Sequence, residues 1–160
     1  MADLLEEALG RHGGTMSKEL AFLTIIMGAV HADNRVRKEE TEEVNALIDR
    51  VRTLKSMPEE ERNKRRDDLL PCMNDPSLRN DRVGLACSSI LNAERGTPPT
   101  VAPQPGLAIA VFTHACDIVY TDLEVTDLEK KFLVDLVDHL KIDRATAANI
   151  VKVIAAKNEY

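Results

Sequence analysis

Two segments of this chain are apolar almost all round, and they restrict the fold more than any other feature. Residues Ser17–His31 and Gly106–Tyr120 carry aliphatic or aromatic side chains on nearly every side of a helix. Such a helix must be covered by other elements. The longest apolar run, Leu20–Val30, has 11 residues, whereas a membrane span needs about 20. We therefore expect two buried helices in a bundle, without direct insertion into a membrane.

The rest of the chain supplies helices that could cover these two. Apolar residues recur at helical spacing and nowhere alternate as in a strand, which predicts an all-α fold. The length, 160 residues, suits one domain, 1–160. We predict a bundle of seven to eight helices, joined halfway by a Pro-rich connection at 96–106, with Pro71 ending the fourth helix. The expected helices are Ala2–Leu9, Ser17–His31, Lys38–Leu54, Glu59–Leu70, Ser77–Ala93, Gly106–Tyr120, Asp127–Leu140 and Asp143–Lys157.

Charge and composition exclude several classes of protein. The net charge of −6 would repel a phosphate backbone, and aromatic residues, at only 3%, are too few to stack with bases. We therefore expect no nucleic acid partner. The acidic N-terminus lacks the basic region of a signal peptide, so we expect a cytoplasmic protein. Three unclustered cysteines in apolar company, Cys72, Cys87 and Cys116, predict buried thiols and no disulfide framework.

A short acidic pattern occurs twice. Residues 32–44 and 121–133 both contain D-x-x-V-x-x-x-E, at an offset of 89 residues. Asp33 corresponds to Asp122, and Glu40 corresponds to Glu129. Each copy lies between an apolar helix and an amphipathic one, so we predict an internal pseudo-twofold repeat of two helical hairpins. That symmetry would place the two acidic turns at related positions.

The acidic turns suggest a site for a divalent metal ion. Carboxylates are hard oxygen ligands that suit Ca, Mg or Mn, and a nearby imidazole would shift the preference towards Zn or another transition metal. Asp117, in an otherwise apolar helix, is costly to bury unless it is paired, which makes it either a hydrogen-bonding residue or a site residue. The candidate ligands are Asp33, Glu40, Asp122, Glu129, His31 and Asp117.

Each of these residues also has a purely structural interpretation. Thr126 and Glu129 have the spacing of a capping box, which would explain the glutamate without a metal. The negative charge of Glu40, in the first turn of its helix, would interact favourably with the helix dipole. Asp33 and Asp122 could accept hydrogen bonds from backbone amides of their own turns.

The repeated motif resembles the signature of the TerB-like family of tellurite-resistance proteins, A-D-G-x-[hydrophobic]-x-x-x-E after a buried helix. The first copy reads Ala32-Asp33-Asn34-Arg35-Val36 with Glu40, and the second reads Thr121-Asp122-Leu123-Glu124-Val125 with Glu129. The resemblance covers about 18–157. Asn34 replaces the usual glycine, and asparagine tolerates the left-handed conformation. Leu123 replaces it in the second copy, which departs further from the pattern.

The resemblance implies a non-enzymatic, all-helical component of a bacterial tellurite- or stress-resistance system. Family members have been proposed to hold metal ions at their acidic turns. They are thought to assemble with other resistance-system proteins, some of them at the membrane. A homo-oligomer also stays open.

Two other functions compete with this one. A carboxylate-bundle metalloenzyme of the di-iron kind needs Glu-x-x-His pairs, and no glutamate lies three residues before any of the four histidines. An acidic interaction module would instead dock a basic partner without any metal. The one basic run, 62–66, is flanked by acidic residues, so we expect a salt-bridged, solvated helix face there.

Overall fold

The structure, a computed structural model, describes residues 16–35, 38–96, 102–121 and 124–160, and for residues 38–43 the backbone alone. Within these ranges it contains eight helices and no strand, which confirms the all-α class. The expected helix Ala2–Leu9 lies outside the described residues. The helices are α2 (Lys18–Val30), α3 (Lys38–Arg50), α4 (Arg52–Lys55), α5 (Glu59–Met73), α6 (Pro76–Arg95), α7 (Leu107–Val119), α8 (Asp127–His139) and α9 (Arg144–Glu159).

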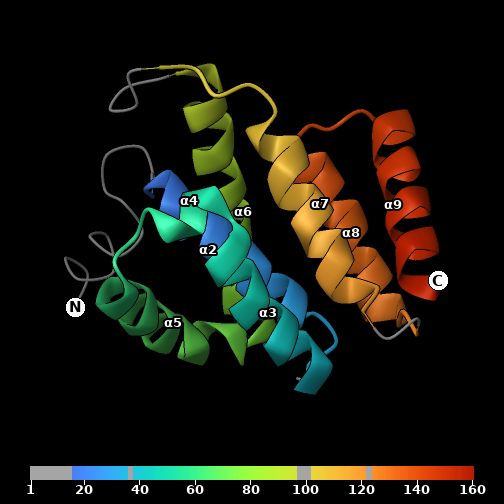
Figure 1. Ribbon diagram of the computed structural model, residues 1–160, viewed down its shortest axis with the longest axis horizontal. Coiled ribbons are helices and arrows are strands. Elements are labelled where there is room, and N and C mark those ends of the chain that lie inside the picture. Colours follow the sequence, from blue (N-terminus) through green and yellow to red (C-terminus); the bar gives the residue numbers. More distant parts are fainter. Residues whose placement is uncertain (1–15, 36–37, 97–101, 122–123) are drawn as a thin grey trace.

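Helices α2 and α7 form the centre of the bundle, as their apolar sequences predict (Figure 1). Every residue of α2 from Ala21 to Val30 is buried. Helix α2 packs against α3, α4, α5, α6 and α7, while α7 also contacts α8 and α9. Phe22 and Phe112, one from each central helix, are the largest fully buried side chains. The two apolar segments thus form a shared core.

Each central helix is followed by an antiparallel partner, α3 after α2 and α8 after α7 (Figure 1). Helices α2 and α7 pack against each other and run in the same direction. Their C-terminal ends, at His31 and Tyr120, therefore lie at the same end of the bundle, which we call the turn end. The internal twofold symmetry of the two hairpins remains a prediction.

Two predicted helix boundaries were wrong. The segment 38–54 is not one helix, because Val51 adopts an extended conformation (φ −78°, ψ 119°) and separates α3 from the single turn α4. Pro71 does not end α5, which continues to Met73. A proline lacks its own N–H and crowds the carbonyl four residues before it, but this can kink a helix without ending it. Here Pro71 lies in the last turn, where Asn74 N–H still donates to the carbonyl oxygen of Leu70.

The cysteines and the charged run were predicted in part. Cys87 and Cys116 are buried, and burial raises the pKa of each thiol to about 12. Cys72 is only partly buried, against expectation, because it lies near the end of the solvated helix α5. On that helix Arg65 lies 3.9 Å from Glu61, as expected, but Arg62 donates instead to the backbone of Ile48 in α3.

Among the helices of the described ranges, none is both long enough and apolar enough to cross a membrane.

Candidate functional site

Asp33 belongs to the turn that follows α2, and its side chain is almost completely buried, with 2% exposed. Its Oδ1 accepts a hydrogen bond from the backbone N–H of Arg35 at 3.0 Å, and its Oδ2 lies 3.9 Å from Nε of Arg35. The first of these contacts is the local turn interaction that the structural interpretation predicts. The buried carboxylate nonetheless lies at the turn end of the bundle, where the metal hypothesis requires it.

A buried arginine, Arg79 in the first turns of α6, holds this turn in place. It is 5% exposed, and its guanidinium donates to the carbonyl oxygen of Met73 at 2.9 Å and to Oδ1 of Asn34 at 3.1 Å. Burial lowers the pKa of Arg79, while the charges of Asp33 and Asp75 raise it. The Asp33 carboxylate therefore has a positive charge in its neighbourhood, which opposes the approach of a metal cation.

Asn34 has the left-handed conformation that its place in the motif predicts, with φ at 63°. An asparagine adopts this conformation more readily than most other residues. Here its side chain has a second use, because it accepts the hydrogen bond from Arg79. A glycine at this position would supply the conformation without the contact.

His31 ends α2 and is 8% exposed. Burial and the positive charge of Arg79 lower the pKa of its imidazole, so the ring is neutral at pH 7. A neutral imidazole can bind a metal ion through nitrogen. His31 also lines a cavity of about 490 Å³ together with Asn63 and Arg66 of α5, so a solute could reach this side chain.

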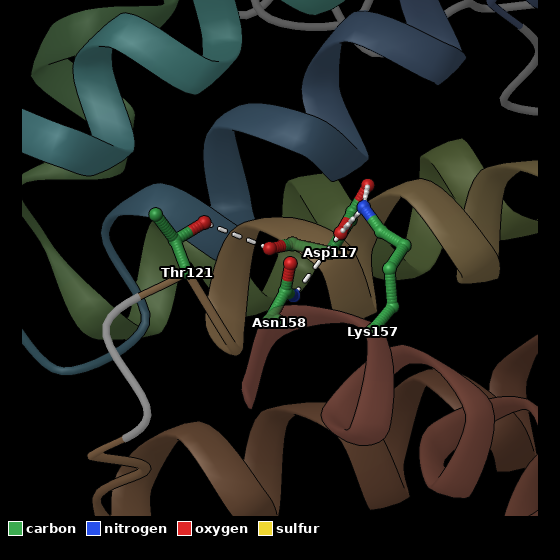
Figure 2. Close-up of polar contacts among 4 residues, drawn as sticks. All are labelled: Asp117, Thr121, Lys157 and Asn158. Atoms are coloured by element: carbon green, nitrogen blue, oxygen red, sulfur yellow. Dashed lines mark hydrogen bonds and ion pairs between the residues drawn. The ribbon is translucent and has the colours of Figure 1, made fainter. Parts of the chain in front are cut away.

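Asp117 has two polar partners on α9 (Figure 2). Its carboxylate accepts from Nζ of Lys157 at 2.8 and 3.1 Å and from Nδ2 of Asn158 at 3.2 Å. The hydroxyl of Thr121 donates to the backbone carbonyl of Asp117 at 2.8 Å. These contacts match the hydrogen-bonding alternative for Asp117.

Glu129 forms the predicted capping box at the start of α8. The Thr126 hydroxyl accepts from the Glu129 N–H at 3.2 Å, and the Glu129 carboxylate accepts from the Thr126 N–H at 3.0 Å. The glutamate is fully buried, with 0% exposed. The cap thus accounts for this carboxylate without a metal.

The structure therefore describes the side chains of some of the six candidate ligands and not of the others. Within the described ranges, no group of three or more His, Cys, Asp or Glu side chains is arranged to hold a metal ion. The Glu40 side chain and all of Asp122 lie outside the described residues. The structure places His31 and Asp33 together at the turn end, gives Asp117 partners on α9, and uses Glu129 as a cap.

Sequence reasoning missed Arg79. It follows an N-cap aspartate and Pro76, and this pattern predicts an exposed first turn of a helix. No local signal shows that the turn after α2 lies against it, because the two segments are 45 residues apart.

In comparisons with protein-family models, curated proteins and solved structures, nothing matches this chain.

Proposed function

We propose that this chain is a non-enzymatic component of a bacterial tellurite- or stress-resistance system that binds a divalent cation at the turn end of the bundle. The resemblance of its two acidic motifs to the TerB-like signature supports the assignment to such a system. One structural observation supports this location of the cation site. Helices α2 and α7 run in the same direction, so both motif-bearing turns start from the same end.

The contacts of the described residues support a smaller ligand set than the sequence alone. Asp117 and Glu129 are engaged with α9 and with the cap of α8. A ligand set of three carboxylates and one neutral imidazole would suit Mn or Zn better than Ca, because nitrogen donors favour transition metals. The ligands in this proposal are His31, Asp33, Glu40 and Asp122.

The test is elemental analysis of the purified protein, followed by chelation and thermal melts with Ca, Mn or Zn. We expect stoichiometric metal and a rise in Tm of several degrees when the ion is returned. Asp33→Asn should abolish the rise, since the amide keeps the oxygen that accepts from Arg35 but loses the charge. Asp49→Asn, on the exposed surface of α3, is the matched control. A protein without metal and without a shift in Tm would refute the cation proposal.

A second function is favoured by a specific observation. Asp33, Asp117 and Glu129 already have partners within the chain, and Arg79 places positive charge beside the first of them. We propose as the alternative an acidic interaction module that docks a basic partner from the same resistance system. Capture of that partner would weaken with salt and would be unaffected by a chelator. Capture that a chelator abolishes would reject the module and favour the cation.

A further inference from the structure

The turn end of the bundle holds a buried positive charge, that of Arg79, which none of the proposed cation ligands supplies. Arg79 lies in the first turn of α6 and is 5% exposed. Its Nη2 donates to Oδ1 of Asn34 at 3.1 Å, and its Nη1 donates to the carbonyl oxygen of Met73 at 2.9 Å. The two contacts fix the guanidinium between the end of α5 and the turn after α2.

Two of the four proposed ligands, His31 and Asp33, lie close enough to this charge to be affected by it. The residue that accepts from the guanidinium, Asn34, directly follows Asp33 in the chain. Burial lowers the pKa of Arg79, and the charge of Asp33 raises it. Burial and then the charge of Arg79 lower the pKa of His31. Arg79 is therefore an electrostatic neighbour of both ligands.

The charge of Arg79 is permanent near neutral pH. An arginine side chain keeps its proton in proteins even where burial lowers its pKa. Water screens a buried charge only weakly, so its repulsion of other cations is stronger than at the surface. A divalent cation bound to Asp33 would therefore share that carboxylate with the guanidinium of Arg79.

We propose that Arg79 sets the affinity of the turn end for divalent cations, as an internal cation that competes with the bound ion for the charge of Asp33. This inference rests on the cation site proposed above. Arg79 is a positioning residue in that site, because it holds the turn through Asn34 and a guanidinium has no lone pair to ligate a metal. The wild type should bind a cation more weakly than its ligands allow, and removal of the charge should strengthen binding.

Calorimetric titration of the metal-free, full-length chain with Mn²⁺ tests the proposal, at about pH 8, where the imidazole of His31 is neutral in every variant. Arg79→Gln should bind Mn²⁺ at least about tenfold more tightly than the wild type, since the repelling charge is gone. Arg79→Lys loses the guanidinium but keeps the charge, and should stay within about threefold of the wild type. Arg95→Gln removes an exposed charge from the other end of α6, and should change the affinity by less than about twofold. A purely structural role of Arg79 would give glutamine and lysine the same effect.

Thermal melts check that each variant folds, and Asn34→Gly takes the place of Arg79→Gln if the latter does not. Glycine keeps the left-handed conformation and removes the contact that holds the guanidinium at the turn, so Mn²⁺ should bind at least about threefold more tightly. Wild-type binding that the folded variant does not strengthen, or that glutamine and lysine strengthen equally, would overturn the role of Arg79 and leave the cation site standing. Absence of binding in the wild type and in every variant would refute the cation site itself, and this inference with it.

Discussion

Nζ of Lys157 lies 2.8 Å from Oδ1 of Asp117, and this ion pair ties the last helix to the centre of the bundle (Figure 2). The two residues are 40 positions apart. The side chain of Asp117 is 15% exposed and that of Lys157 is 55% exposed. The carboxylate is therefore mostly withdrawn from water, while the ammonium group reaches it from the surface.

We predict that Lys157→Gln lowers the free energy of unfolding by about 1 kcal/mol, or Tm by about 3 °C, because Asp117 loses its charged partner. Lys152→Gln, at another exposed lysine of α9, is the control and should have almost no effect. Urea unfolding measures both variants. In an Asp117→Asn background, Lys157→Gln should cost less, and equal losses in both backgrounds would show that the pair contributes nothing.

The contact between Arg79 and Asn34 gives a second prediction. Arg79→Met should destabilise the protein by about 2 to 4 kcal/mol, since it leaves the buried carbonyl oxygen of Met73 without its donor and also removes the contact with the Asn34 side chain. Arg95→Met, at the exposed end of the same helix, should cost less than about 1 kcal/mol.

Substitutions of Asn34 separate backbone conformation from side-chain contact. Asn34→Gly loses the contact with Arg79, whereas Asn34→Ala also has a methyl group in a left-handed conformation at φ 63°. We expect alanine to be about 1 kcal/mol worse than glycine. Equal stabilities, measured by thermal and urea unfolding, would contradict the strained geometry of this turn.

Stability should depend on pH through His114. Burial, then Arg50 and Lys157, lower the pKa of its imidazole from 6.5, and Asp117 only partly opposes them. The unfolded chain therefore binds a proton more readily than the folded one. The contribution of His114 to stability is present above pH 6.5 and is lost as the pH falls through the lower, folded-state pKa.

Urea unfolding between about pH 7.5 and about pH 5.5 tests this prediction. His114→Gln should reduce the loss of stability towards acid, and the slope that remains should include His31, whose pKa burial also lowers. A slope that is identical in the wild type and in His114→Gln would refute the assignment.

Much of the fold could be predicted from the sequence, because the segments 17–31 and 106–120 are too apolar for any place but the centre. The break at Val51 could not, since periodicity continues through it and only the packing of α4 against α2 reveals the extended residue. Pro71 misled for a different reason. A proline removes one hydrogen bond and crowds the preceding turn, which can kink a helix without ending it.

The candidate site was predictable only where the signal was local. The capping box of Thr126 and Glu129 and the left-handed Asn34 both follow from neighbouring residues, and the structure confirms both. The partners of Asp33 and Asp117 include Arg79 and Lys157, which are distant in sequence and carry no motif. Long-range pairing of this kind depends on the three-dimensional arrangement of the helices.

The most direct test of the central claim is the broadening of amide resonances by paramagnetic Mn²⁺ added in small amounts to the metal-free protein. The account predicts saturable broadening centred on Asp33, Asn34, Tyr120 and Thr121, at the turn end of the bundle, and its loss in Asp33→Asn. Broadening scattered over the acidic surface, or broadening that Asp33→Asn leaves unchanged, would contradict a cation site at the ends of α2 and α7.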